Sequence, residues 1–443
     1  MDLKEDGNRK SHGISRKTFL GSSAALVGGA LLHSLPVEAS AYVSGGEPLK
    51  LALIGCGSRG TGAAVQALRS VRPVELVAMA DIFRDMLDRS YDNLTGIEDV
   101  QPFVQVPEEH KFVGLDAYKE AIDLADVVIL ATPPAFRPLH FEAAVQADKH
   151  VFLEKALATD GPGVRTILSA GKLAKEKNLS VVVGLQYRYS LEYIELVNRI
   201  KEGGIGDIVS ANTQRFGGHI TLIRREPEQT ELEFQLRNWR YFNWQWGGSP
   251  VGLNIHHTDI VNWVKEAYPV QAHGVGGRAA LNDPDHGDIF DHYSIEYQYE
   301  DGTKMHSPIR TIDGCHTNAA FYLQGTDGTA DLRGGIQNRK GETVWRYRDI
   351  DDPSPYQREI DILFQSILDG KGVNDTEWGA HSTLTAIMGR MAAHSGQIIR
   401  REDALNSDLR LVPELHSFED EAPVLPNEDG TYNVPVPGKT AVL

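Results

Sequence analysis

A short apolar run followed at once by glycines is the clearest pattern near the start of the chain. Residues 49–54 read LKLALI, which is typical of a buried strand, and GCGSRG at residues 55–60 opens a helical pattern that continues to residue 68. In dinucleotide-binding domains a strand, a tight glycine turn and a helix follow one another in this way. The pattern therefore predicts a strand, a phosphate-binding loop and a helix in direct succession.

Four further apolar runs alternate with helical patterns after this loop. They lie at residues 74–80, 126–131, 150–153 and 180–184. Strands that alternate with helices are typical of a parallel sheet with helices on both faces. We therefore predict an α/β protein whose nucleotide-binding Rossmann domain covers residues 48–180.

The apolar pattern changes in the second half of the chain. Shorter runs in which polar and apolar residues alternate occur at 207–216, 292–299 and 304–310, as in antiparallel sheets with one exposed face. A chain of 443 residues also exceeds what one hydrophobic core usually supports. We therefore assign residues 181–443 to a second domain that binds substrate and forms oligomers.

A different pattern precedes both domains. Basic residues stand before an apolar stretch at 19–35, and ASA at 39–41 follows it as a small-residue cleavage pattern. We interpret residues 1–41 as a signal peptide. Residues 15–20 read SRKTFL, which resembles a twin-arginine signal with lysine at the second arginine and predicts export to the periplasm. An ordinary secretory signal or an uncleaved anchor stays open as the alternative.

An acid after the second apolar run predicts which dinucleotide binds. Asp81 lies about twenty residues beyond the glycine loop, where an acid accepts hydrogen bonds from the ribose hydroxyls of NAD. We expect NAD rather than NADP, although Arg84 is near enough in sequence to bind a 2′-phosphate. The alternative role of Asp81 is to cap the helix that follows.

The carboxyl ends of the predicted parallel strands bring further residues to one crevice. Thr132 and Pro133 are expected against the cofactor, whereas Arg137 and His140 on the next helix face either the site or solvent. The residues expected to bind the cofactor are Gly55, Gly57, Ser58, Arg59, Gly60, Asp81, Thr132, Pro133, His140, Glu154, Lys155 and Gln186.

Lys155 carries the candidate chemistry at this edge of the sheet. It follows the run at residues 150–153, so we expect it beside the nicotinamide and within reach of a substrate hydroxyl. There its charge stabilises a developing oxyanion, or a pKa lowered by burial makes it an acid and base. A surface lysine after a strand is the alternative.

The stretch at residues 237–246 interleaves aromatic and polar side chains. Its sequence, RNWRYFNWQW, offers flat apolar faces and hydrogen-bonding groups, which is the chemistry of a sugar site. The alternative is an aromatic core segment or an oligomer interface. The residues expected to contact the substrate are Arg188, Trp239, Tyr241, Trp244 and His292.

Composition and charge exclude several kinds of partner. The formal net charge of −17 opposes phosphate backbones and anionic lipid head groups, so neither nucleic acid nor a membrane surface is expected as a partner. No apolar run in the mature part is long enough to insert into a membrane. The two cysteines, Cys56 and Cys315, have no metal-ligand spacing, so no metal is expected. A neutral small molecule remains as the partner.

These motifs together resemble the Gfo/Idh/MocA family, that of glucose–fructose oxidoreductase and inositol dehydrogenase. The resemblance rests on the loop at 55–60, ATPP at 131–134, Glu154-Lys155 where the family has E-K-P, and residues 248–263. It implies a Rossmann domain followed by an α/β domain with an open, mainly antiparallel sheet. That sheet faces the nicotinamide in the family and often mediates homo-oligomers, here a dimer or tetramer.

The family's second signature consists of an acid, a histidine and an aspartate. Here the histidine corresponds to His256 and the aspartate to Asp259, but the acid corresponds to Gly252. The resemblance thus implies Lys155, His256 and Asp259 as catalytic residues, with His257 as the neighbour that can replace His256. On a helix, positions 256 and 259 lie on one face. A core histidine bonded to the aspartate is the alternative.

Three functions remain open at this point. The first is an oxidoreductase that keeps NAD bound and oxidises a carbohydrate hydroxyl, for example at C3 of a glycoside. The second is an NAD-dependent glycosidase, as in relatives of the α-N-acetylgalactosaminidase type, which oxidises, eliminates, adds water and reduces again. The third is a sugar-binding protein without activity, since fold alone does not establish chemistry. Export favours a bound cofactor, because no pool of NADH is available outside the cytoplasm.

Overall fold

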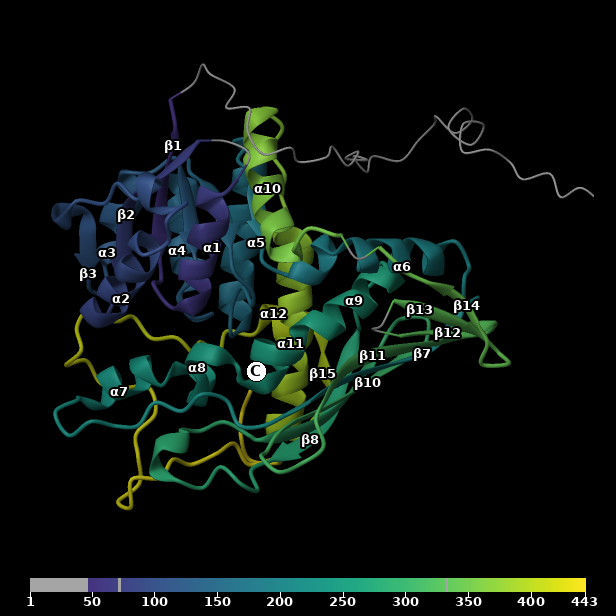
Figure 1. Cartoon of the computed structure of the whole chain (residues 1–443). Coiled ribbons are helices and arrows are strands. Elements are labelled where there is room, and N and C mark those ends of the chain that lie inside the picture. The colour runs from purple at the N-terminus through teal and green to yellow at the C-terminus, as the bar shows by residue number, and fades with distance from the viewer. Residues whose placement is uncertain (1–46, 71–72, 332–333, 350) are drawn as a thin grey trace, which may run out of the picture. The chain divides into compact units, whose positions relative to one another are not determined.

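The computed structural model describes residues 47–70, 73–331, 334–349 and 351–443, which form two sheets and the helices packed against them (Figure 1). The predicted signal peptide at residues 1–41 lies outside the described residues. Within the described ranges, every helix is too short or too polar to cross a membrane.

Six parallel strands form the first sheet, in the order β3-β2-β1-β4-β5-β6. This is the order of a doubly wound dinucleotide-binding sheet. Strands β4 and β6 are buried at every position, as expected for a parallel sheet covered on both faces. The bounds are β1 (Leu49–Ile54), β2 (Val74–Asp81), β3 (Lys111–Val113), β4 (Val127–Leu130), β5 (His150–Leu153) and β6 (Val181–Val183).

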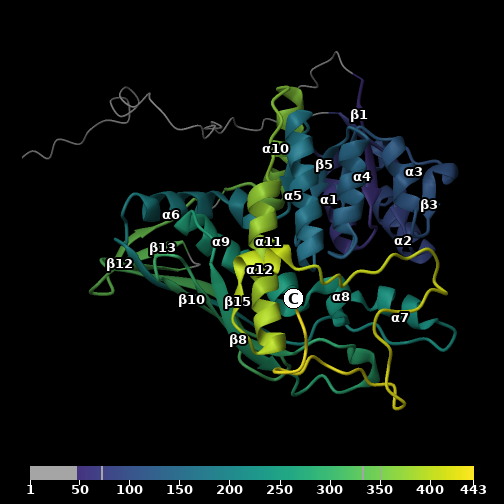
Figure 2. The same cartoon turned by 180° about the vertical axis from the view of Figure 1, so that it is seen from behind.

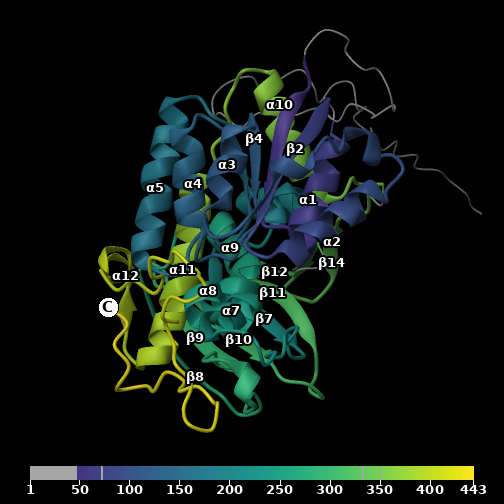
Figure 3. The same cartoon turned by 90° about the vertical axis from the view of Figure 1, so that its left-hand side faces the viewer.

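Helices cover both faces of this sheet (Figure 3). Ala52 and Ile54 of β1 face a core that includes α3 (Ala117–Asp123), α4 (Arg137–Gln146) and α5 (Gly161–Glu176). Leu51 and Leu53 face the opposite core, formed with α1 (Ser58–Leu68), α2 (Arg84–Thr95) and α10 (Pro355–Leu368). The alternation of side chains along β1 thus separates the two helical layers.

Nine strands form the second sheet, in the order β14-β13-β12-β11-β7-β10-β9-β8-β15. Every neighbouring pair is antiparallel except β7 and β10. Buried and more exposed positions alternate along β10, because only one face of the sheet is covered by helices. The bounds are β7 (Ile208–Gly217), β8 (Gln271–Gly277), β9 (His292–Gln298), β10 (Lys304–Thr311), β11 (Asn318–Gly325), β12 (Gly328–Asp331), β13 (Gly335–Asn338), β14 (Thr343–Arg346) and β15 (Ile399–Arg400).

One buried helix joins the two sheets. Helix α11 (Thr376–Ser395) packs against α5 on one side and against β8 and β9 on the other, and α12 (Arg401–Asn406) lies beside both helices (Figure 2). The remaining helices are α6 (Leu191–Lys201), α7 (Glu231–Arg237), α8 (Asn243–Trp246) and α9 (Ile255–Lys265), and the π-helical turn η6 (Pro250–Asn254) leads into α9.

The predicted α/β fold is confirmed, with a Rossmann sheet followed by a mainly antiparallel one. The first sheet extends beyond the boundary expected at residue 180, because β6 begins at Val181 and pairs with β5. Helix α10 also returns to the first sheet from far along the chain. Strand β3 was missed by the sequence pattern, since its three residues carry little apolar signal.

Candidate functional site

The glycine loop between β1 and α1 leaves room for a phosphate. Gly55 has a φ of 93°, and a Cβ there would lie 2.6 Å from the amide nitrogen of Thr132. A Cβ at Gly60 would lie 2.0 Å from the carbonyl oxygen of Gly55, whereas one at Gly57 would meet no atom of the chain within 4 Å. Helix α1 begins at Ser58 without a side-chain cap, so its first amides point at an open space suited to an anion.

A cavity of about 870 Å³ opens in front of this loop. Its volume is within the range of sites that enclose small molecules and cofactors. Nine of the expected cofactor residues line it, and they come from the ends of β1, β2 and β4 and the helices that follow. These are Gly55, Gly57, Ser58, Arg59, Gly60, Asp81, Thr132, Pro133 and His140.

Asp81 connects the end of β2 to the glycine loop. Its carboxylate accepts hydrogen bonds from the amides of Cys56 at 2.7 Å and Phe83 at 3.0 Å, and burial raises its pKa. A carboxylate has about four lone-pair directions, so capacity remains for a ribose hydroxyl. Arg84, the alternative phosphate ligand, pairs instead with Asp88 and Glu108 and does not line the cavity.

Helix α4, which follows β4, carries two buried polar side chains. His140 is buried, and its Nδ1 lies 3.2 Å from the hydroxyl of Thr132 in the cavity wall. Burial and the charge of Arg137 lower the pKa of His140 to about 3, so the ring is neutral. Arg137 is buried too and donates to the carbonyl of Ala156. The alternative of a solvated helix face is therefore wrong for both residues.

Arg59 of the glycine loop binds two carboxylates rather than pointing into the cavity alone. Its guanidinium pairs with Glu154, and its Nη2 lies 2.6 Å from Glu359 of α10. It also lies over the ring of Tyr356, 4.8 Å from its centroid. The side chains of Arg59 and Glu154 thus hold the loop in place, and Arg59 is left to contact a phosphate through its backbone. Glu154, Lys155 and Gln186 do not line the cavity.

Lys155 follows β5 of the first sheet by two residues and contacts the second half of the chain. Its Nζ donates a hydrogen bond of 2.8 Å to the carbonyl oxygen of Gly252 in η6. Burial lowers the pKa of Lys155 to about 8; the charge of Glu154 opposes this shift, and nearby arginines, Arg240 among them, add to it. Lys155 itself does not line the cavity, but Arg240, whose charge acts on it, does.

His256 is the histidine that interacts with Lys155. Burial and then the charge of Lys155 lower the pKa of His256 well below its usual value, whereas burial and Arg215 lower that of His257 to about 4. The Nδ1 of His256 is buried without a hydrogen-bond partner among the described residues. His257 has its Nδ1 3.3 Å from Asn254 instead. The two neighbours therefore differ in their surroundings, and both rings are neutral.

The carboxylate of Asp259 binds an arginine and a serine. Both of its oxygens accept hydrogen bonds of 2.9 Å from Arg188, and the hydroxyl of Ser382 donates to it as well. Arg188 in turn lies between the rings of Trp263 and Trp378. A guanidinium fork matches a carboxylate in two parallel bonds, which outcompetes a histidine at that face. The hydrogen bond between a core histidine and Asp259, named above as the alternative, is not found among the described residues, because the carboxylate binds Arg188 instead.

The residues expected to contact a sugar lie in different surroundings in the structure. Tyr241 is fully buried and donates to the carbonyl of Ile220, and Trp244 is buried with its Nε1 bonded to Gln235, so both belong to the aromatic core named as the alternative. Trp239 lines the cavity. His292 lies half-exposed at the start of β9 and pairs with Asp291.

A comparison with known protein families finds a match for the N-terminal part of the chain. Residues 49–185 match the family described as "Oxidoreductase family, NAD-binding Rossmann fold", named GFO_IDH_MocA. Residues 49–185 are a Gfo/Idh/MocA domain. The resemblance inferred from the motifs is thus confirmed, and with it an NAD-binding oxidoreductase fold.

Other proteins are similar to this chain over most of its length. A "Glycosyl hydrolase family 109 protein" of Shewanella baltica (strain OS185) is 22% identical over 369 residues, covering 78% of this chain and 71% of the relative. An "Alpha-N-acetylgalactosaminidase" of Shewanella oneidensis is 22% identical with the same coverage. The structure of scyllo-inositol dehydrogenase from Lactobacillus casei, with NAD(H) and scyllo-inositol bound, has a TM-score of 0.61 at 18% identity and covers 80% of this chain and all of its own.

The departure from the family signature at Gly252 has a steric cause. A Cβ at position 252 would lie 1.9 Å from Nε1 of Trp246, a buried side chain in α8. The indole thus occupies the space that an acidic side chain at position 252 would need. Lys155 therefore has the backbone carbonyl of Gly252 as its acceptor at this position.

We expect Gly252→Ala to destabilise the fold. The added methyl group has to displace the buried indole of Trp246, and overpacking of this kind costs about 1–3 kcal/mol. Urea unfolding measures the loss. Gly62→Ala is the matched control, since a Cβ there meets only the end of Arg59, at 3.9 Å. A Gly252→Ala protein as stable as the control would mean that Trp246 moves freely.

Two contributors to the cleft were missed in the sequence. Arg240 lines the cavity and lies 4.3 Å over the ring of Trp239, and no hydrogen bond to its guanidinium is found in the described part of the chain. Residues 410 and 412–416 near the end of the chain form a further part of the wall. Arg240 stood within the aromatic stretch singled out above, but nothing in the sequence indicated that the C-terminal residues lie here.

Proposed function

We propose that this protein keeps NAD bound in the cleft and oxidises a hydroxyl group of a carbohydrate. The observation that carries the proposal is the position of Lys155, which touches Gly252 of the second half and lies close to Arg240 in the cleft wall and to His256. A cationic group and a neutral base next to a dinucleotide cleft are the parts that alcohol oxidation requires.

The cleft residues suit NAD. Open space at Gly57 and the uncapped start of α1 suit the pyrophosphate, and Asp81 suits the ribose. The unpaired guanidinium of Arg240 adds positive charge to the same cleft. When bound, the nicotinamide accepts the hydride. NADP remains the second choice, since a carboxylate at position 81 repels a 2′-phosphate.

The chain's own residues would move the proton. Because its pKa is about 8, Lys155 is mainly charged at neutral pH and stabilises the oxygen as its proton leaves. His256 is neutral, and its Nδ1, for which the described part of the chain provides no hydrogen-bond partner, would accept that proton. The two side chains thus act on the same hydroxyl with different roles.

The proposal is tested by purifying the protein without added cofactor and then denaturing it. We expect NAD or NADH in the supernatant. The intact protein is then incubated with a panel of glycosides, and the products are identified by mass spectrometry. Keto-sugars support oxidoreduction, whereas absence of any dinucleotide together with no affinity for added NAD overturns the cofactor assignment.

Glycoside cleavage is the second candidate, favoured by the names of the curated relatives. In that cycle a hydroxyl, typically at C3, is oxidised and the neighbouring proton becomes acidic. The glycosidic group is then eliminated, water adds, and the ketone is reduced again, so that NAD is regenerated. Release of free monosaccharide in the panel identifies this activity. Lack of hydride transfer with every glycoside supports a sugar-binding protein without activity.

Asp81→Ala should weaken the binding of NAD more than that of NADP. Charge-assisted hydrogen bonds to the ribose are lost with NAD, about 1.5–3 kcal/mol, whereas with NADP a repulsion is removed as well. Titration calorimetry with both dinucleotides measures the difference. Asp81→Asn is the control, because an amide oxygen still accepts the hydrogen bond of Cys56. Equal losses for both dinucleotides would mean that Asp81 acts only by holding the glycine loop.

Location and assembly complete the proposal. We infer export to the periplasm by the twin-arginine route, which moves folded proteins and would carry the cofactor across with the chain. We also infer a homo-oligomer, a dimer or tetramer, through the open face of the second sheet. Exposed apolar residues on that face, such as Val275 and Tyr322, support it. Periplasmic fractionation and light scattering test the two inferences.

A further inference from the structure

We propose that residues 411–418 form a strap that crosses the mouth of the cleft and retains the dinucleotide. The inference rests on the proposed function, because it takes the cleft as the site of NAD. Five consecutive residues of the strap, 412–416, line the cavity. The glycine loop lines the same cavity from the Rossmann side, so a bound dinucleotide would lie between the loop and the strap.

The strap begins at the N-terminus of α5. The amide of Leu411 donates a hydrogen bond of 2.8 Å to Oδ2 of Asp160, whose Oδ1 caps α5 by accepting from Gly163. Just before the strap, Arg165 of α5 donates to the carbonyls of Leu405 and Ser407 at 2.6 and 2.7 Å. The chain is therefore fixed to the segment that follows β5 before it enters the strap.

The strap ends at the loop that follows β2. The ring of Phe418 stacks on that of Phe83, with centroids 5.6 Å apart and planes 5° from parallel. The guanidinium of Arg237 also lies 3.9 Å over Phe83 and pairs with Asp85 of α2. Phe83 comes two residues after Asp81, so this end of the strap is next to the expected ribose site.

The strand order places these two anchors on opposite sides of the phosphate loop. In the first sheet β2 is followed by β1, β4 and β5. A segment that runs from the end of β5 to the end of β2 has to cross the ends of β4 and β1, where Thr132 and Gly57 lie. The strap thus covers the edge at which doubly wound sheets bind their ligands.

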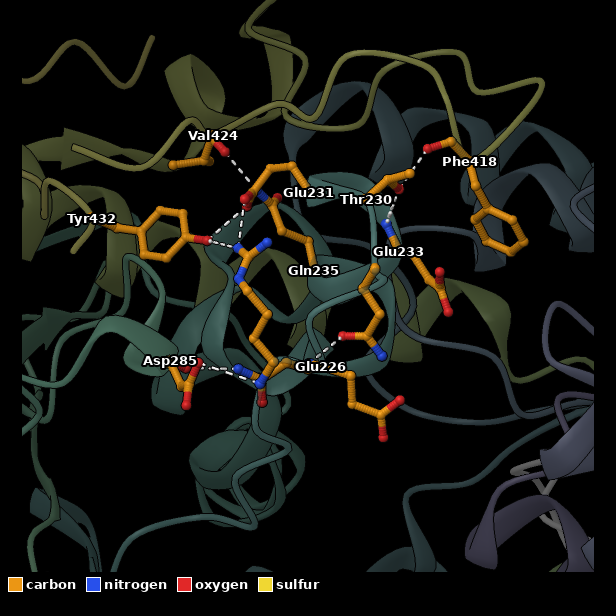
Figure 4. A network of polar contacts seen from close by, with 12 residues as sticks. Glu226, Thr230, Glu231, Glu233, Gln235, Asp285, Phe418, Val424 and Tyr432 are labelled. Carbon is orange, nitrogen blue, oxygen red and sulfur yellow. Dashed lines mark hydrogen bonds and ion pairs between the residues drawn. The ribbon is translucent and has the colours of Figure 1, made fainter. Parts of the chain in front are cut away.

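The last residue of the strap and the chain that follows it form hydrogen bonds with α7 and the loop before it (Figure 4). The hydroxyl of Thr230 donates to the carbonyl of Phe418 at 2.7 Å, and Gln235 donates to that of Val424. The hydroxyl of Tyr432 donates to Glu231 at 2.6 Å and accepts from Arg225 at 2.9 Å. These contacts hold the strap closed from the second half of the molecule.

A fastened strap makes release of the cofactor depend on local opening of the C-terminal segment. Its anchors are a stack of two rings and a few hydrogen bonds, which are weak enough to open without unfolding of either sheet. Such a device suits an enzyme whose redox cycle closes on the bound cofactor. It would slow both the entry and the exit of NAD.

The test measures release of bound NADH from the wild type and from Phe418→Ala/Tyr432→Phe. NADH fluorescence is followed after mixing with excess NAD. One ring stack and two hydrogen bonds are lost, so we expect release on the order of tenfold faster, with faster association as well. Phe418→Tyr keeps the ring and should behave as the wild type. Tyr347→Phe is a second control, since it removes a tyrosine–carboxylate bond to Asp352, far along the chain from these anchors.

Equal release rates in the wild type and the double variant overturn the strap and leave the cofactor assignment intact. A wild type that binds no dinucleotide overturns the proposed function and the strap together. Should the double variant not fold, amide hydrogen exchange of the wild type decides. Exchange in residues 411–418 should slow when NAD is added to the NAD-depleted protein, with β8 as an unaffected reference. Unchanged exchange in the strap would contradict the proposal.

Discussion

Lys155→Met should abolish reduction of the bound NAD by substrate while leaving the dinucleotide in place. The charged side chain is replaced by an apolar one of similar length, so packing is kept and only the stabilisation of the substrate oxygen is lost. Groups of this kind contribute about 10²–10⁴-fold to the rate. Single-turnover absorbance of the reduced nicotinamide after mixing with substrate measures it.

The pH dependence separates the two roles open to Lys155. Its pKa is lowered to about 8, mainly by burial, so the side chain is charged below that pH and neutral above it. If the ammonium stabilises the oxygen, the hydride-transfer rate falls as the pH rises through about 8. Lys155→Arg keeps its charge across this range and should lose the dependence along with much of the rate. A rate that rises through the same pH would identify the neutral amine as the base.

His256→Ala should be nearly as damaging as the change at Lys155, whereas His257→Ala should keep most of the activity. The reason is position: the charge of Lys155 acts on His256, and His257 lies beside Asn254. Loss of the proton acceptor is expected to cost about 10²–10⁴-fold in the single-turnover rate. The adjacent histidines of α9 thus serve as each other's control.

The double variant Lys155→Met/His256→Ala adds a sharper criterion. Residues that act as one unit are far from additive, so the double change should cost little more than either single change. Because burial and Lys155 hold the pKa of His256 well below its usual value, the base stays neutral and active well below pH 6.5. A His256→Ala protein with the normal single-turnover rate would refute the assignment and direct attention to His257 and His292.

Asp259 and the aromatic stretch at residues 237–246 show that the spacing of residues in the sequence does not determine their hydrogen-bond partners. His256 and Asp259 are three residues apart, which predicted a common helix face, but Asp259 is taken by Arg188 from η4 (Gln186–Tyr189), some 70 residues earlier in the chain. Tyr241 and Trp244 carry groups suited to sugars, yet their polar atoms are used within the core. In each case the partner that binds the side chain in the folded structure is one that the local spacing did not indicate.

By itself, the sequence determined the features that depend on neighbouring residues. The apolar run of β1, the glycine spacing at 55–60 and the position of Asp81 specify a nucleotide fold, because strand, turn and helix are formed by local patterns and backbone freedom. The alternation in β9 and β10 likewise predicted a half-exposed sheet.

Only the tertiary structure decided how distant segments meet. Trp246 fills the space above Gly252, Glu359 binds Arg59 across 300 residues, and residues 412–416 line the cleft. Contacts of this kind depend on shape and burial in the folded chain, where close packing admits one arrangement. No periodicity or motif records them, so the Rossmann site was predictable whereas the C-terminal part of its wall and the environment of Lys155 were not.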